Sequence, residues 1–146
     1  MNPARRWIIR ADATLIMVAA AVGLVISSLG YYRNTGPYAF LHRVEVGHAG
    51  LIQAYLLAAA LAVVMLVGSR ARDPRPFNLV GAMVHASILP AYLLHWSYLG
   101  SVAGNVRLVV IFHSAFTVAE VWAAAPHRRW EHHPAGAVTP DHAVAG

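Results

Sequence analysis

The sequence has no cysteine and few charged residues. Without cysteine the chain can form no disulfide, no thiolate nucleophile and no cysteine-ligated metal site. Only 12% of the 146 residues are charged, whereas 58% are hydrophobic, which is not the composition of a soluble domain. We expect no cleavable signal peptide, because the first apolar run is too long for an h-region and lacks a clear small-residue cleavage site. The composition indicates a single membrane-embedded domain.

Four apolar runs are each close to the ~20 residues that cross the ~30 Å hydrocarbon core of a bilayer. They show no alternation of period two, so helices are expected rather than barrel strands. The sequence predicts an all-α, polytopic four-helix membrane bundle over residues 1–125. A disordered cytoplasmic tail rich in proline, glycine and histidine is predicted over 126–146. The predicted spans are residues 11–29, 46–68, 79–100 and 106–125.

Arginine placement predicts the orientation of these spans. The arginines that precede the first span, fill the loop at 69–77 and follow the fourth span outnumber the three on the other side. By the positive-inside rule, both termini and that loop are cytoplasmic, in a multi-pass protein of the cell (inner or plasma) membrane. The net charge of +5 is therefore interpreted as a topology signal, and no nucleic-acid partner is expected.

Ionisable residues inside membrane spans are costly and commonly functional. Helical spacing places them in two predicted layers. The outer layer has one histidine from each of three helices, His48, His95 and His113, and the inner layer pairs His85 with Glu120. Neutral imidazoles at a dry helix interface suit haem iron or a transition metal. The inner pair is interpreted either as a structural contact or as a proton relay.

Two further acidic residues have simpler interpretations. Asp12 lies at the predicted cytoplasmic edge of the first span, where it would favour the helix dipole. Glu45 and His48 have the spacing of half a di-iron site, but such sites need several carboxylates and a second motif, and the chain has one.

The segment His48-Ala49-Gly50-Leu51-Ile52-Gln53-Ala54, which opens the second span, resembles the styrene oxide isomerase family. The first span and the loop containing Asp73-Pro74-Arg75 are also similar to that family. Its members are small four-helix membrane enzymes. An H-x-G element near the outer end of their second helix supplies the axial ligand of a haem b. The ferric haem acts as a Lewis acid on an epoxide oxygen and gives an aldehyde by hydride shift.

The resemblance implies that His48 is the metal ligand of a haem b and that the substrate is a small hydrophobic epoxide. We expect Gln53 and His113 as further cofactor-binding residues, and Tyr92 and His95 as catalytic residues that hydrogen-bond the substrate oxygen. The chain departs from the family in three respects. The amide expected six residues after the ligand is replaced by Ala54, with Gln53 rotated by ~100°. His95 lies where the family places a tyrosine. The chain also has His85 and His113, which are not part of the family's pattern. These departures affect the predicted substrate and the predicted reaction, but not the ligand role of His48.

Two alternatives remain open from the sequence. If His48 and a second histidine both ligate the iron, the protein is a bis-histidine cytochrome for electron transfer. If no haem binds, the tightly packing Ala- and Gly-rich helices suit a non-catalytic membrane subunit of a larger complex. One four-helix unit is thin for enclosing haem and substrate within the lipid bilayer, so a homo-oligomer is expected.

Overall fold

A computed structural model describes residues 3–102 and 105–126, so the predicted tail lies outside the described residues from position 127 onward. All the elements in these ranges are helical, which confirms the predicted all-α class. Four of the helices are long and apolar enough to cross a membrane, namely α1, α2, α3 and α5. The elements are α1 (Pro3–Arg33), η1 (Ala39–Arg43), α2 (Glu45–Gly68), α3 (Arg75–Leu94), α4 (Trp96–Val102) and α5 (Val106–Ala124).

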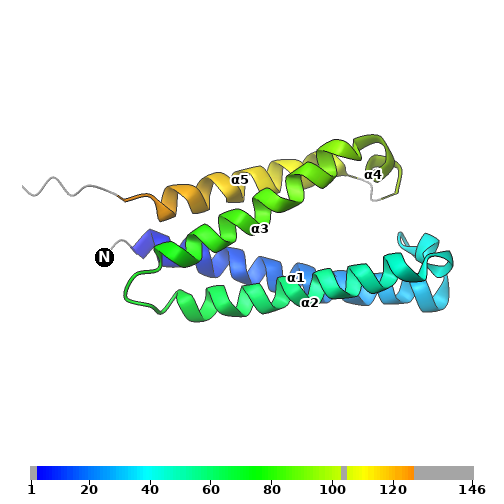
Figure 1. Cartoon of the computed structure of the whole chain (residues 1–146), viewed down its shortest axis with the longest axis horizontal. Helices are drawn as coiled ribbons and strands as arrows, with labels where there is room; N and C mark the ends of the chain where they lie inside the picture. The colour runs from blue at the N-terminus through cyan, green and yellow to red at the C-terminus, as the bar shows by residue number, and fades with distance from the viewer. Residues whose placement is uncertain (1–2, 103–104, 127–146) are drawn as a thin grey trace, which may run out of the picture.

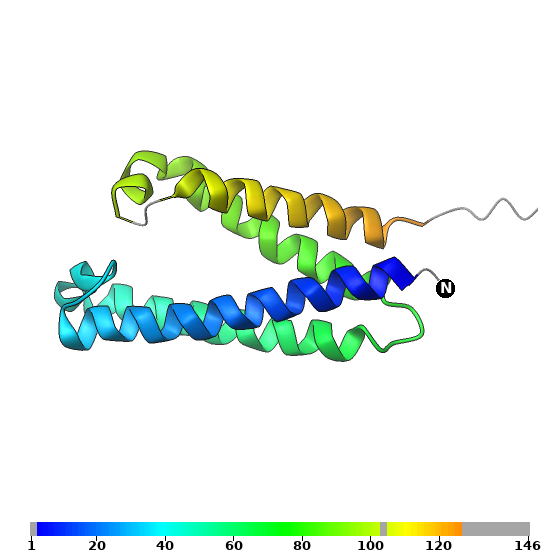
Figure 2. The ribbon, with the colours of Figure 1, turned by 180° about the vertical axis from the view of Figure 1, so that it is seen from behind.

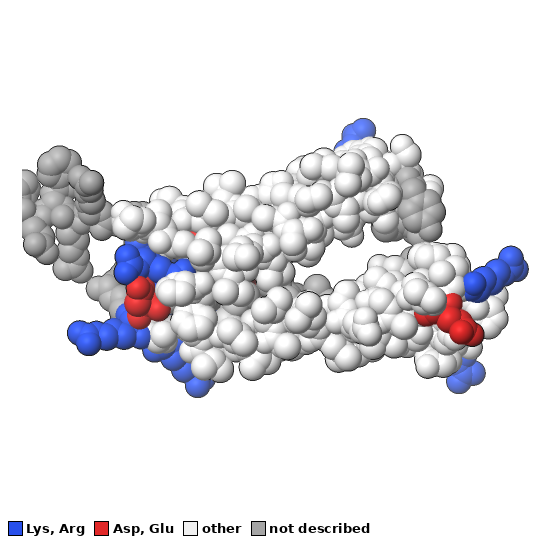
Figure 3. All heavy atoms as spheres, viewed as in Figure 1, with Lys and Arg blue, Asp and Glu red and all other residues white. Residues whose placement is uncertain are grey.

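The helices form two hairpins, one of α1 with α2 and the other of α3 with α5 (Figure 1). We call the end where α1 and α3 begin the arginine-rich end, and the opposite end, with η1 and α4, the far end. The hairpins approach each other toward the arginine-rich end and separate toward the far end, as seen from both sides (Figures 1 and 2). Figure 3 shows an open gap between them in the half nearer the far end, which we call the inter-hairpin cleft.

The helix bounds differ from the predicted spans at two places. α1 extends beyond the predicted 11–29 in both directions and begins about two turns of helix before the predicted apolar stretch. The predicted third span of 79–100 is interrupted, because α3 ends at Leu94 and residues 96–102 form the separate α4. His95 leaves the helical region at φ −111° and ψ 28°. Pro90 has no N–H to donate one turn earlier, which weakens the helix just before this break.

The core lies between the hairpins in the half nearer the arginine-rich end. Its buried cluster joins α1 residues such as Ile9 and Ile16 to Met65 of α2. Val80 and Val84 of α3, in the other hairpin, pack against this cluster. Gly68 is required by close packing, because a Cβ there would overlap the ring of Phe77. Most other large apolar side chains point outward, as expected of helices surrounded by lipid.

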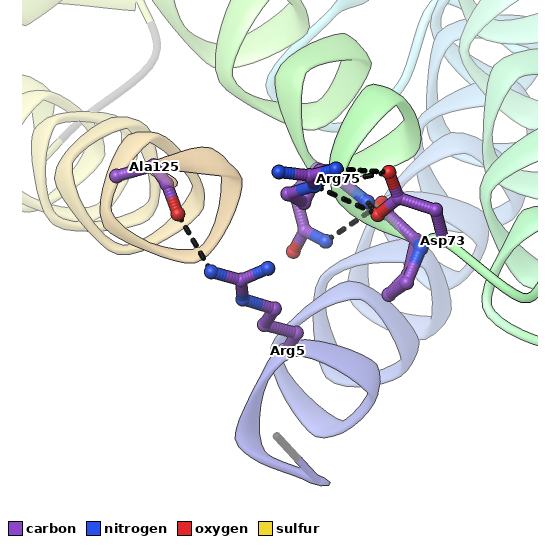
Figure 4. A network of polar contacts seen from close by, with 6 residues as sticks. Arg5, Asp73, Arg75 and Ala125 are labelled. Carbon is purple, nitrogen blue, oxygen red and sulfur yellow. Dashed lines mark hydrogen bonds and ion pairs between the residues drawn. The ribbon is translucent and has the colours of Figure 1, made fainter. Parts of the chain in front are cut away.

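Arginines tie the chain together at the arginine-rich end (Figure 4). Arg5 Nη2 donates to the carbonyl of Ala125 at 2.6 Å, which links the start of α1 to the end of α5. Arg75 forms a two-pronged ion pair with Asp73, with Nη2 2.7 Å and Nε 2.9 Å from Oδ2. The hydrogen bonds from Arg75 hold the pKa of Asp73 below its ordinary value.

Candidate functional site

A chain of hydrogen bonds joins three helices inside the bundle. His85 of α3 lies 1% exposed and uses both ring nitrogens. Its Nε2 is 2.6 Å from Oδ1 of Asp12 on α1, and its Nδ1 is 2.6 Å from Nδ1 of His113 on α5. Asp12 is completely buried, while His113 is only partly buried. The chain therefore runs from a partly accessible imidazole to a carboxyl group with no access to solvent.

The order of donors and acceptors along this chain follows from the bonding. With Asp12 ionised, His85 Nε2–H donates to it, because a carboxylate can only accept. A neutral His85 then has a lone pair on Nδ1 and accepts from His113 Nδ1–H. His113 is left with its Nε2 lone pair outside the chain. Such an imidazole, oriented by its other nitrogen, is suited to act as a proton acceptor.

Glu120 adds a second buried carboxyl group beside Asp12. A Cβ built on Gly81 of α3 would lie 2.9 Å from Asp12 Oδ2 and 3.1 Å from Glu120 Cδ, so both carboxyl groups close around this glycine. Among the described residues, Asp12 Oδ2 and both Glu120 oxygens have no hydrogen-bond partner. The two carboxyl groups therefore lie together in one buried acidic site. We call Asp12 and Glu120 the carboxyl pair.

Aromatic rings surround the imidazoles. Phe116 stacks on His85 with ring centroids 5.2 Å apart, and Phe112 meets His85 edge-on at 5.9 Å. The ring of Tyr92 lies 6.4 Å from that of His113. Tyr92 also interacts electrostatically with Tyr55 of α2, which belongs to the opposite hairpin. These rings shield the hydrogen-bond chain on the α3–α5 side and place phenol hydroxyls near its accessible end.

His48 lies in a different place, near the far end of the α1–α2 hairpin. It is 5% exposed and stacks on Tyr31, with centroids 4.1 Å apart and an interplanar angle of 4°. Tyr32 meets the same ring edge-on at 5.5 Å. Nε2 of His48 is buried and has no hydrogen-bond partner among the described residues. A buried nitrogen without a partner costs about 1–3 kcal/mol, so its state fits a ligand atom for haem iron.

The predicted outer layer of three histidines is not formed. α2 and α5 make no contact within the described ranges, so His48 and His113 belong to different sites. His113 instead joins His85 in the inner network, because both face the α3–α5 interface. His95 is the exposed C-cap of α3, and Gln53 of α2 is also exposed. Of the residues predicted as catalytic, the structure places only Tyr92 beside a network imidazole.

Asp12 was interpreted from sequence as a helix-terminal residue, and the structure overturns that interpretation. Because α1 begins at Pro3, Asp12 lies in its third turn, where its carboxyl group is buried against His85. The dipole effect applies only to the first turn. The sequence contains a signal for this burial. Ile9 lies three residues before Asp12, Ile16 lies four residues after it and Ala13 is next to it, so Asp12 belongs to the apolar face of the helix.

Comparison with known proteins gave no match to a family model, to a curated protein or to a solved structure. The fold and the site define the class of protein. It is an all-α chain whose described residues include four potential membrane spans and a buried carboxyl–imidazole network.

Proposed function

We propose that this chain is a multi-pass membrane enzyme that holds haem b through His48 and isomerises a small hydrophobic epoxide to an aldehyde or ketone. The observation that carries the proposal is the buried Nε2 of His48, which has no partner among the described residues. When bound, ferric haem would supply a Lewis acid for the epoxide oxygen. The resemblance of the His48-Ala49-Gly50 element to the styrene oxide isomerase family supplies the reaction class.

The protein itself would contribute four things to this function. Stacking on Tyr31 fixes the plane of the His48 ring, so Nε2 has a single direction for a ligand. The inter-hairpin cleft opens along helices with apolar outer surfaces, which gives a hydrophobic epoxide a route from the bilayer (Figure 3). A site within the bilayer also excludes water, which would divert the opened epoxide to a diol. Tyr92 is the better placed of the two predicted catalytic residues for binding the substrate oxygen, because His95 is exposed.

The decisive experiment is an absorption spectrum of protein purified in mild detergent from cells supplied with haem precursor. We expect a Soret band in the wild type that is lost in His48→Ala. The matched control is His42→Ala, because His42 is an exposed histidine near the same end whose ring nitrogen contacts the carbonyl of Tyr31. It should keep the band. A colourless wild type, or a band unchanged in His48→Ala, would refute the proposal.

The same preparation separates the isomerase from the bis-histidine cytochrome. The separation of α2 from α5 in the described chain leaves His48 without His113 as a second ligand in one copy. We therefore expect a high-spin ferric haem whose spectrum shifts when imidazole or cyanide is added. Conversion of an aryl epoxide to its aldehyde, followed by gas chromatography, should then depend on His48. A low-spin spectrum insensitive to added ligands would instead establish the cytochrome.

We further propose a homo-oligomer in the cell membrane, with the arginine-rich end in the cytoplasm. The absence of native cysteine makes the orientation directly testable. Single cysteines at Thr35, in the exposed loop after α1, and at Ala71, in the loop before α3, lie at opposite ends of the bundle. A membrane-impermeant maleimide should label Thr35→Cys in intact cells, and Ala71→Cys only after permeabilisation. The reverse pattern would overturn the orientation.

A further inference from the structure

The buried network of Asp12, His85, His113 and Glu120 has no part in holding a ligand at His48, which is on α2 and stacks on Tyr31 near the far end. We propose that these four residues form a proton-transfer chain that links the inter-hairpin cleft to the arginine-rich end of the bundle. The proposal goes beyond the haem-dependent isomerase and does not depend on it.

The geometry gives the chain two distinct ends. His113 is partly exposed, lies beside Tyr92, and is seven residues from the start of α5 at Val106, in the half where the hairpins separate, so this end meets the cleft. Glu120 is completely buried and lies four residues before the end of α5 at Ala124, or about 6 Å along the helix. The carboxyl pair is therefore about one helical turn from the end where the arginines gather.

Each transfer step is balanced by the hydrogen bonds already present. A proton from the cleft forms an N–H bond at His113 Nε2. The Nδ1–H bond of the same ring then breaks as its proton moves to His85 Nδ1, whose nitrogen lies 2.6 Å from His113 Nδ1. The Nε2–H bond of His85 breaks in turn, and the proton from Nε2 moves to Asp12 Oδ1, which lies 2.6 Å from that nitrogen. One positive charge has moved from the cleft to the carboxyl pair, and no oxidant or reductant is involved. The reverse transfers, or rotation of the two rings, restore the starting tautomers.

The side chains around the chain suit this role. The titratable groups that face it are Asp12 from α1, His85 and Tyr92 from α3, and His113 and Glu120 from α5. α2 contributes the methyl group of Met65, which would lie 2.8 Å from a Gly81 Cβ. The three buried carboxyl oxygens without partners are acceptors available for the transferred proton. Chains of Asp, Glu and His within membrane spans are typical of proton pathways.

The test is proton flux into liposomes that contain the purified full-length protein and the pH-sensitive dye pyranine. A potassium gradient with valinomycin drives the proton. We expect the wild type to exceed Asp12→Asn by roughly a hundredfold, the lower end of the gain from a positioned proton acceptor. Glu120→Gln should also be slow. The matched control, His42→Gln, changes an exposed histidine near the far end and should equal the wild type. A wild type no faster than Asp12→Asn or than empty liposomes would overturn the proposal.

A second measurement needs no variant and so does not depend on how the variants fold. Protein labelled with ¹⁵N-histidine in lipid nanodiscs is titrated by NMR. At neutral pH we expect His113 to carry its proton on Nδ1. Protonation of His113 Nε2 should change the His85 Nδ1 signal in the same titration step, because the two nitrogens share one proton across 2.6 Å. If the His85 signal does not change when His113 is protonated, the network is only a structural link between the helices and the proposal is wrong.

Discussion

The Asp12–His85 pair is the contact between the two hairpins whose energy can be predicted most closely. Both residues are at most 1% exposed and their N···O distance is 2.6 Å. The contact contains a buried charge, the Asp12 carboxylate, and breaking a buried charged contact by removing one partner typically costs about 3–5 kcal/mol. We expect Asp12→Leu and His85→Leu each to lower the free energy of unfolding by this amount. His85→Leu should be the worse of the two, because it also deprives His113 of its partner.

The double variant distinguishes a charged contact, with Asp12 ionised, from a hydrogen bond between neutral Asp12 and neutral His85. Replacing both members of a buried pair by apolar residues is often neutral or stabilising, so Asp12→Leu/His85→Leu should be more stable than either single variant. The expected coupling energy is above about 2 kcal/mol. Neutral interhelical hydrogen bonds in membrane proteins average only about 0.6 kcal/mol, with a maximum near 1.7.

Unfolding in mixed micelles, followed by circular dichroism as denaturing detergent is added, gives the four free energies of the cycle. Ser87→Ala is the matched control, because Ser87 is exposed on α3 and donates only within its own helix, to the carbonyl of Val84. It should change stability by less than about 0.5 kcal/mol. A double variant as unstable as the sum of its two single variants would show that the pair does not join the hairpins.

Three further predictions concern the arginine-rich end and its close packing. Gly68→Ala should lower stability by about 1–3 kcal/mol because its Cβ would overlap Phe77, whereas Gly50→Ala, with open space around it, should not; thermal unfolding in detergent measures both. The ion pair of Asp73 with Arg75 lowers the pKa of Asp73, so its small contribution is present above the ordinary value of 3.8 and lost as pH falls through the lowered pKa. Wild type and Asp73→Asn should therefore converge in stability in strong acid, and a difference that persists there would contradict this. Arg5→Gln should loosen the last turn of α5, seen as faster amide hydrogen exchange there than in the wild type; unchanged exchange would contradict the link.

The fold class was predictable because the physics of a bilayer leaves few choices. Apolar runs of about 20 residues can satisfy their backbone groups in lipid only as helices. Each predicted span overlaps one long helix of the structure, the third only as far as Leu94. The ends were less predictable. The apolar character continues through Leu94 and Trp96, so hydropathy does not indicate the break at His95, and Pro90 is the local signal for it.

The site was predictable in its members more than in its pairings. Helical spacing selected His85, His113 and Glu120 as intramembrane polar residues, and the structure buries all three at least in part. Helical spacing could not show that His113 faces His85 rather than His48, because that depends on which helices pack together. Two side chains at similar depth in the membrane meet only if their helices are neighbours. Within the described chain, α5 packs against α3 and α1 but not against α2.

The position of the network also explains why the hairpins join where they do. Lipid tails are as apolar as leucine, so helices in a membrane gain little from hydrophobic contact and associate through close packing and polar links. The hairpins meet in the half that contains Gly81 and the Asp12–His85 bond, and separate toward the far end (Figure 3). The groups proposed to carry the proton are thus the groups that connect α1 to the α3–α5 hairpin. Because Asp12→Asn keeps the shape and the hydrogen-bonding capacity of the side chain but removes its charge, it should retain much of this connection while stopping proton transfer. The leucine variants should lose both.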